Sequence, residues 1–184
     1  MPVPTLETKR LILRAFTLAD AKRVQHLAGA FAVADTTGHM PHPYQDGMAE
    51  EWIGGLDSEF EHGEGATFAI TLPATGELIG AIGLTLHSHN KRAEMGYWLG
   101  VPYWNHGYTS EAARAVLQFA FEQLNLNRVY ASHFPRNPAS GRVMQKIGMK
   151  YEGTLRQHFV RWQDPEDLVY YGILKSEWKR STNL

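Results

Sequence analysis

The sequence contains no cysteine. This absence excludes disulfide bonds, zinc sites built on cysteine, iron–sulfur clusters and a catalytic thiol. An excess of charge of one sign is also missing, since 18 basic residues face 19 acidic ones and the pI is about 6.8. A near-neutral pI disfavours a dedicated DNA-binding protein with a basic face. Any chemistry in this chain must therefore proceed without a sulfur nucleophile of the protein.

Long apolar runs are absent as well. The longest stretch without a charged residue covers residues 95–110, and glycine, proline and polar residues interrupt it. Such a stretch does not span a membrane. The N-terminal residues, with two prolines and early charges, lack the pattern of a signal peptide. We expect a cytoplasmic protein that makes no direct contact with membranes or nucleic acids.

Apolar residues make up 43% of the 184 positions, enough for a buried core in one domain over residues 1–184. Hydrophobic periodicity predicts seven strands and four helices. The strands are expected at residues 9–16, 66–72, 78–86, 92–100, 128–133, 149–161 and 168–174, and the helices at 17–28, 46–62, 109–124 and 139–147. A meander of antiparallel strands followed by a βαβα order is typical of an α+β fold with a mixed, mostly antiparallel sheet.

Residues 97–112 are expected to run from a strand through a loop into a helix. Gly107 allows the loop backbone to turn, and Thr109 or Ser110 can cap the helix. The free N–H groups of the first helical turn and the positive end of the helix dipole would then form a site for a phosphate. The spacing alone also fits an ordinary capped helix. The P-loop pattern G-x-x-x-x-G-K-[ST] is absent.

Four segments together carry a resemblance to a known family. They are E-T-K-R-L-I-L-R at residues 7–14, A-E-M-G-Y-W-L-G-V-P-Y-W-N-H-G-Y-T-S-E-A-A at 93–113, N-P-A-S-G-R-V-M-Q-K-I-G-M-K-Y-E-G-T-L-R at 137–156 and D-L-V-Y-Y-G-I-L-K-S-E-W at 167–178. In this order the chain resembles the GNAT N-acetyltransferases, specifically the branch that acetylates the N-termini of ribosomal proteins. The resemblance covers nearly the whole chain and implies the GNAT fold, with acetyl-CoA as cosubstrate.

The resemblance further implies a sheet that splays open between the strand ending at Gly100 and the strand at residues 128–133, with acetyl-CoA in the opening. The residues implied in cofactor binding are Trp98, Leu99 and Val101 beside the pantetheine arm, Asn105, His106, Gly107, Tyr108, Thr109 and Ser110 around the pyrophosphate, Asn137 and Ser140 near the arm and sulfur, and Arg142 near the 3′-phosphate. Relatives commonly have a glycine and a basic residue where this chain has Asn105 and His106. A mostly neutral imidazole predicts a weaker attraction for phosphate.

Transfer of an acetyl group from a thioester to an amine needs no covalent enzyme intermediate when both substrates are held in line, which agrees with the missing cysteine. A carboxylate can accept the proton of the amine. Glu94 is our candidate, because strand alternation separates it from Ala93 and Met95 and because the family has a glutamate there. A solvated glutamate on an exposed strand is the alternative. Backbone N–H groups around residues 98–99 would stabilise the oxyanion, as in the family.

Ser140 is the second catalytic candidate, since the family places this serine near the sulfur, where its hydroxyl can donate a hydrogen bond to the departing thiolate. Asn137 and Ser140 also fit a plain role in helix capping. Many relatives in other branches have a tyrosine acid seven residues after that asparagine, but here the position is Met144. The reserve candidates for the acid are Tyr97, Tyr108 and Tyr170.

Nine histidines raise the question of a metal site. His39 with His42, and His87 with His89, lie close in sequence. Neither pair has the H-E-x-x-H frame of a zinc site, and no cysteine can complete a ligand set. We therefore expect no metal.

The acceptor is the least determined part of the function. The resemblance favours a peptide α-amine, with a ribosomal-protein N-terminus as the implied partner, and residues 31–44 with the second helix should wall its site. A small amine such as a polyamine, an amino acid or an antibiotic is an alternative, and a polyamine would require at least two convergent carboxylates. A non-catalytic CoA-binding module is a third reading. The sequence leaves open a monomer or a homodimer.

Overall fold

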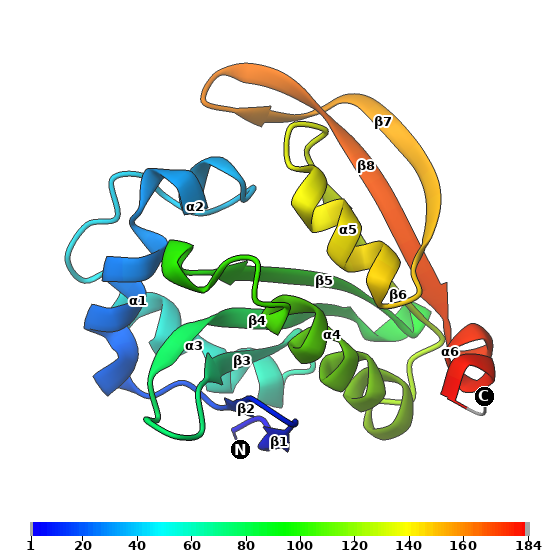
Figure 1. The fold of residues 1–184 in the computed structure, drawn as a ribbon, viewed down its shortest axis with the longest axis horizontal. Coiled ribbons are helices and arrows are strands. Elements are labelled where there is room, and N and C mark those ends of the chain that lie inside the picture. Colours follow the sequence, from blue (N-terminus) through cyan, green and yellow to red (C-terminus); the bar gives the residue numbers. More distant parts are fainter. Residues whose placement is uncertain (1, 183–184) are drawn as a thin grey trace.

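The structure is a computed structural model that describes residues 2–182 (Figure 1). Its strands are β1 (Leu6–Glu7), β2 (Ile12–Arg14), β3 (Gly65–Thr71), β4 (Leu78–His87), β5 (Arg92–Leu99), β6 (Arg128–His133), β7 (Lys150–Arg161) and β8 (Asp164–Leu174). Its α-helices are α1 (Ala21–Ala28), α2 (Phe31–Asp35), α3 (Met48–Glu61), α4 (Tyr108–Gln118), α5 (Pro138–Lys146) and α6 (Lys175–Thr182). Short 3₁₀ helices cover Leu18–Asp20, Ser88–Asn90 and Val101–Tyr103, and a π-helical turn at Phe119–Gln123 extends α4.

The mixed α and β class and the mostly antiparallel sheet agree with the prediction. The described residues form eight strands and six α-helices instead of the seven strands and four helices expected. The additional elements are short: β1 has two residues, α2 has five within the segment expected as a loop, and α6 has eight. Elements this short carry too few residues to show a hydrophobic period, so their neighbours determine their conformation.

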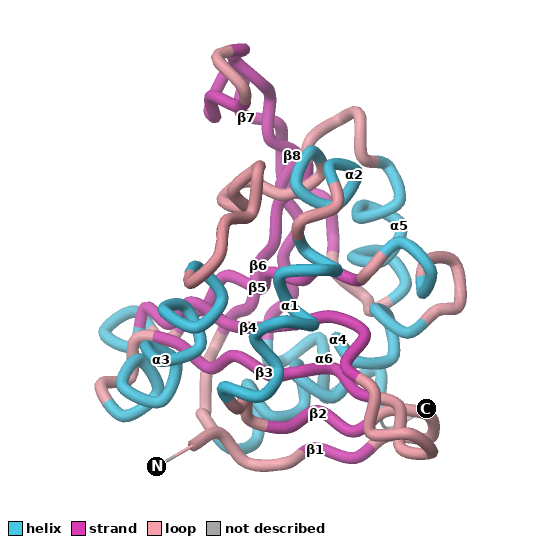
Figure 2. Tube along the Cα trace, turned by 90° about the vertical axis from the view of Figure 1, so that its left-hand side faces the viewer, coloured by secondary structure: helices cyan, strands magenta, loops and turns pink. Residues whose placement is uncertain are grey.

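The strands follow the order β1-β2-β3-β4-β5-β6-β8-β7 in one sheet. All neighbouring strands are antiparallel except β5 and β6, which run parallel. The chain enters β6 only after the crossover through α4. The last two strands form a long hairpin that extends beyond the rest of the sheet (Figure 2).

Alternation along the central strands builds a core on each face of the sheet. On one face, Phe68 and Met95 pack with residues of α4 and α5. On the other face, Ala69 packs with residues of α1 and α3, and Trp98 lies against this second core. Consecutive residues of β5 therefore face opposite layers, and side chains from both layers meet wherever the sheet opens.

The sheet opens between β5 and β6. Their parallel pairing joins Arg92–Glu94 to Arg128–Tyr130 and includes no later residue of either strand. Beyond Glu94 the two strands diverge, although β5 continues to Leu99 and β6 to His133. This is the splay that the resemblance predicted. In the part of the chain that the structure describes, no helix is both long and apolar enough to cross a bilayer.

Candidate active site

A cavity of about 1380 Å³ lies at the splay. Its walls come from α3, from β3 to β6, from the first turn of α4, from α5, from the segment after α2 and from the β7–β8 hairpin. The cavity reaches residues on both faces of the sheet, because the missing pairing between β5 and β6 removes the barrier between the two layers. A molecule held on one face can therefore meet a molecule held on the other.

The backbone of β5 is directed into this opening. The N–H group of Gly100 donates to the carbonyl of Ile79 on β4 at 2.9 Å, and the β4–β5 register continues without interruption from that point. Since hydrogen-bonding direction alternates along an antiparallel strand, the N–H group of Trp98 also faces β4. The N–H groups of Tyr97 and Leu99 then face the splay. Of the two amides expected near the oxyanion, only that of Leu99 has this direction.

The loop before α4 has the backbone geometry expected of an anion site. Asn105 and Gly107 both adopt positive φ, at 64° and 79°, which turns successive N–H groups inward ahead of the helix. Arg10 supports the loop from outside. Its guanidinium donates to the carbonyl of His106 at 3.0 Å and to the carboxylate of Glu111 at 2.7 Å. Sequence analysis did not single out Arg10, because its partners lie about 100 residues away.

Ser140 projects into the cavity from the first turn of α5. Its hydroxyl lies 2.9 Å from the hydroxyl of Tyr97, which also lies 3.1 Å from the Ser140 carbonyl. Asn137 caps α5, because its side-chain oxygen accepts from the Ser140 N–H group at 3.4 Å, and its amide donates to the Thr36 carbonyl at 3.4 Å. The capping role considered for Asn137 is therefore present. Its place on the cavity wall leaves the cofactor role standing as a prediction.

Glu94 lies on the other face of β5 and is half-buried in the cavity wall. It is the last residue of β5 that pairs with β6, where its partner is Tyr130. Burial, followed by the negative charge of Glu94, raises the pKa of the Tyr130 phenol, and the same two causes raise the pKa of Tyr170. The Glu94 carboxylate is thus electrostatically coupled to two tyrosines at the opening, in contrast to a fully solvated strand residue.

The predicted site residues fall into two groups. The residues that line the cavity are Glu94, Trp98, Leu99, Asn105, Gly107, Thr109, Ser110, Asn137, Ser140 and Arg142. Val101, His106 and Tyr108 do not belong to the lining. His106 is exposed, its ring nitrogen Nδ1 lies 2.7 Å from the Trp104 carbonyl, and its ring stacks on Tyr108. His106 lies in the loop before α4, Tyr108 begins that helix and Val101 precedes the loop, but the side chains of these three residues lie outside the cavity lining.

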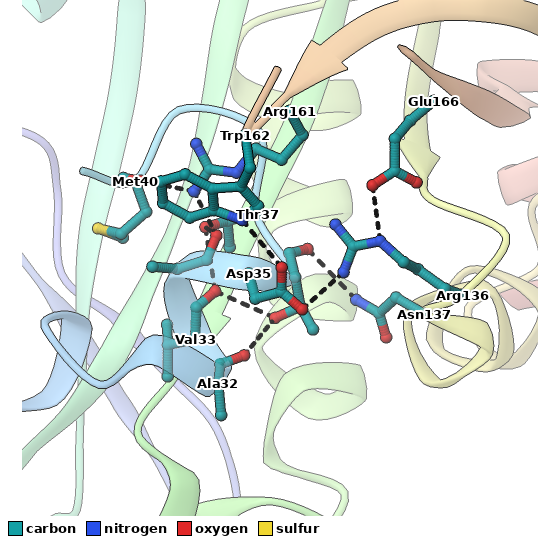
Figure 3. A network of polar contacts seen from close by, with 12 residues as sticks. Ala32, Val33, Asp35, Thr37, Met40, Arg136, Asn137, Arg161, Trp162 and Glu166 are labelled. Carbon is teal, nitrogen blue, oxygen red and sulfur yellow. Dashed lines mark hydrogen bonds and ion pairs between the residues drawn. The ribbon is translucent and has the colours of Figure 1, made fainter. Parts of the chain in front are cut away.

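The far end of the cavity is closed by a contact between distant segments, which we call the latch: residues 31–40 on one side and residues 159–166 of the hairpin on the other (Figure 3). Arg161 donates to the carbonyls of Ala34, Gly38 and Met40, the last at 2.7 Å. The indole N–H of Trp162 donates to Asp35 at 2.9 Å. The latch was not foreseen, since no local pattern joins segments about 127 residues apart.

Two ion pairs reinforce the latch. Arg136 contacts Asp35 and Glu166, each at 2.7 Å, and so connects the loop before α5 to both halves of the latch (Figure 3). Phe159 packs edge-on against His39 and Phe134. The rings of His39, Phe134 and Phe159 line this end of the cavity, whose wall is formed by residues of the 31–44 segment and of the hairpin.

Carboxylates also line the α3 side of the cavity. Besides Glu94, the lining includes Glu51, Glu59 and Glu64. Glu59 and Glu64 lie at or just after the end of α3, next to the β3 strand that carries Gly65. Among the described residues no group of three or more histidine, aspartate and glutamate side chains is placed to hold a metal ion.

Comparison with known proteins identifies the family. The family model for the GNAT acetyltransferase domain matches residues 10–150, well over half of the chain. The chain belongs to the GNAT acetyltransferase family. This acetyltransferase is 33% identical over 175 residues to the uncharacterized N-acetyltransferase YoaA of Bacillus subtilis, covering 94% of this chain and 97% of that protein. GNAT enzymes are acyltransferases that use acetyl-CoA, and the described cavity with its amide-lined loop fits that cosubstrate.

The chain is also similar to acetyltransferases that act on ribosomal proteins. The acetyltransferase is 25% identical over 179 residues to the [ribosomal protein uS5]-alanine N-acetyltransferase of Escherichia coli, covering 89% of each chain. A structure of RimL, a ribosomal L7/L12 α-N-protein acetyltransferase in complex with coenzyme A, superimposes with a TM-score of 0.86 at 18% identity, covering 93% of this chain and 98% of RimL. At that identity the RimL match establishes the shared fold.

Proposed function

We propose that this acetyltransferase, acting as one domain over residues 1–184, transfers the acetyl group of acetyl-CoA to the N-terminal α-amine of a peptide. The observation that carries the proposal is the splay between β5 and β6, which lets one cavity reach both faces of the sheet. Proximity and alignment of two substrates across such an opening supply a large part of the catalysis that this reaction needs.

The cofactor end is built mainly from backbone groups. The N–H groups of the loop at residues 105–110 and the positive end of the α4 dipole would hold the pyrophosphate. The gap-facing backbone at Tyr97 would pair with a pantetheine amide, and the arm would run beside Trp98, Leu99 and Val101. Asn137 would contact the arm, and the exposed Arg142 would reach the 3′-phosphate. Because amides carry no full charge, this arrangement suits a near-neutral chain.

In the chemical step, Glu94 accepts a proton from the acceptor ammonium, directly or through water, on the α3 side of β5. The neutral nitrogen then attacks the thioester carbonyl, a C–N bond forms, and the C–S bond breaks. The gap-facing N–H group of Leu99 stabilises the oxyanion. Ser140 donates a hydrogen bond to the departing thiolate from the α5 side, and solvent supplies the proton that completes the thiol. Glu94 passes the first proton to solvent and then accepts the second proton of the nitrogen, which leaves the neutral amide.

The acceptor assignment has two candidates. Kinship with the Escherichia coli enzyme that acts on ribosomal protein uS5 supports a peptide α-amine. Glu51, Glu59, Glu64 and Glu94 also line the cavity, and their negative charges favour a cationic acceptor of either class. A small polycationic amine is therefore the second candidate.

A thiol-release assay separates the candidates. The protein contains no cysteine, so free CoA is the only thiol that the reaction produces in the mixture. We expect acetyl-CoA to release thiol with peptides that begin with alanine or serine. The same peptides with a blocked N-terminus serve as the matched control and should be inert. Release with spermidine but not with peptides would move the assignment to polyamines. No release with either class would overturn the proposed function.

A further inference from the structure

Tyr97 and Ser140 form a hydroxyl pair at the junction of the two substrate regions. Tyr97 comes from β5 and Ser140 from α5, 43 residues apart, yet their oxygens lie 2.9 Å from each other. Both residues line the cavity. One helical turn beyond Ser140 lies Met144, which is buried in the same wall. The position where other branches have a tyrosine is thus apolar here, and the hydroxyl that contacts Ser140 comes from a different element.

The hydrogens of this pair can be arranged in two ways. Each hydroxyl carries one hydrogen, and either oxygen can accept. If Tyr97 donates to the Ser140 hydroxyl oxygen, the serine hydrogen is free to point into the cavity. If Tyr97 donates to the Ser140 carbonyl at 3.1 Å, the serine can donate to the tyrosine oxygen and its hydrogen is occupied. An anion next to Ser140 takes the serine hydrogen, and the two hydroxyls 2.9 Å apart then stay hydrogen-bonded only if Tyr97 donates to the serine oxygen.

We propose that Tyr97 is a positioning residue for the acyl transfer: its hydroxyl donates to Ser140 and thereby directs the Ser140 hydrogen toward the CoA thiolate. The proposal rests on the proposed function, which places the cofactor sulfur beside Ser140. Hydrogen bonds in such a chain polarise one another. The bond that Ser140 accepts from Tyr97 therefore strengthens the bond that Ser140 donates to the thiolate. Tyr97 acts through Ser140 and does not itself touch the sulfur.

Tyr97 serves as a hydrogen-bond donor and not as the acid. Burial of its hydroxyl raises the pKa of Tyr97 to about 12, partly offset by the bond to Ser140. An ordinary thiol has a pKa of about 8.5, so a proton would not move from this phenol to a thiolate. The tyrosine therefore remains protonated throughout the pH range in which the enzyme would work, and the proton that completes the CoA thiol comes from solvent.

The test titrates the thiol of enzyme-bound CoA, using the ultraviolet absorbance of its thiolate and the complex with desulfo-CoA as the blank. The absence of cysteine makes this thiol the only one in the sample. We expect the bound thiol of the wild type to have a lower pKa than free CoA. In Tyr97→Phe this pKa should be higher than in the wild type by about 0.5 or more, as expected when a charge-assisted donor is weakened. In Ser140→Ala it should rise further.

The double variant and a matched control complete the experiment. Tyr97→Phe should have no additional effect in the Ser140→Ala background, because Tyr97 acts only through the serine. Tyr171→Phe is the control: its hydroxyl also bonds to α5, accepting from Gln145 at 3.0 Å, but it does not line the cavity. It should titrate like the wild type.

Each outcome is informative. A wild-type thiol that titrates like free CoA, or a Tyr97→Phe complex that titrates like the wild type while Ser140→Ala differs, would overturn the role of Tyr97. Additive effects of the two variants would overturn the relay through Ser140. A protein that fails to bind CoA at all would instead refute the cofactor site of the proposed function, which keeps the two failures distinguishable.

Discussion

The two ends of the cavity are built on different principles. The proposed cofactor end comes from two stretches of chain, residues 97–110 and 137–142, which contain the starts of α4 and α5. The proposed acceptor end is lined by residues of the 31–40 segment, α3 and the β7–β8 hairpin, and side chains about 127 residues apart join the first of these to the last.

This difference separates what is general from what is specific. Backbone amides at a helix start can bind any pyrophosphate, so the proposed cofactor end requires few particular side chains. The proposed acceptor end is built instead on particular side chains of the latch. A substitution at one end should therefore alter the affinity for the substrate bound there and change the affinity for the other substrate very little. Changes at the splay should alter the chemical step itself.

Glu94→Gln tests the junction of the two ends and has the largest expected effect. We expect kcat to fall by about 10²-fold or more at neutral pH, the size typical of a lost general base. A peptide α-amine has a pKa of about 8, so the fraction of neutral amine rises with pH and the need for a base falls. The ratio of wild-type kcat to Glu94→Gln kcat should therefore become smaller above pH 8, which a pH–rate profile of both proteins measures.

The control for this variant is Glu122→Gln, which removes the charge of an exposed glutamate that does not line the cavity. It should retain wild-type kcat. Activity of Glu94→Gln equal to that of the wild type at every pH would remove Glu94 from the mechanism. The junction would then contain only positioning groups.

Arg161→Met tests the acceptor end alone. The variant removes donors to the carbonyls of Ala34 in α2 and of Gly38 and Met40 after it. An apolar side chain remains beside the Trp162 ring, over which the guanidinium lies at 3.9 Å. A hydrogen bond that involves a charged group contributes about 1.5–3 kcal/mol to stability. We expect the acceptor KM to rise about 10-fold, equivalent to about 1.4 kcal/mol, with little change in the KM for acetyl-CoA.

Arg156→Met provides the matched control, since Arg156 is exposed on the same strand. A milder variant, Trp162→Phe, removes only the indole donor to Asp35 and should shift the acceptor KM in the same direction by a smaller factor. If Arg161→Met weakened acetyl-CoA as much as the acceptor, the two ends would not be independent and the comparison would fail.

The same contrast explains what the sequence could predict. The seven longer strands, the helices α1, α3, α4 and α5 and the splay were predictable, because hydrophobic periods or motif resemblance extend over neighbouring residues. The hairpin turn was not. Trp162 and Gln163 both adopt positive φ, at 51° and 74°, although neither is glycine, asparagine or aspartate. Such a conformation is costly by itself, and the bond to Asp35 and the rings around Trp162 compensate for it.

At the site, residues were predictable where a strand or helix fixed their direction. Glu94 and Ser140 both reached the cavity wall because strand alternation and the first turn of α5 determine where their side chains point. The bond between Tyr97 and Ser140 and the support of the phosphate loop by Arg10 depend on how distant elements cross. No spacing in the sequence encodes that crossing.

His106→Lys tests the cofactor end alone and has the smallest expected effect. His106 is exposed at the loop and lies outside the cavity lining, so a longer cationic side chain there can approach the phosphates without displacing a wall residue. We expect the Kd for CoA to fall by about threefold at low salt and the gain to vanish near 0.5 M salt, because exposed charges are screened over a few ångströms at that ionic strength. Calorimetric titration at the two salt concentrations measures both values.

His89→Lys adds the same charge at an exposed position in the 3₁₀ helix between β4 and β5, so it should leave the Kd unchanged. An equal gain from His89→Lys would mean that net charge alone attracts CoA, whereas no gain from His106→Lys at low salt would place the phosphates away from this loop.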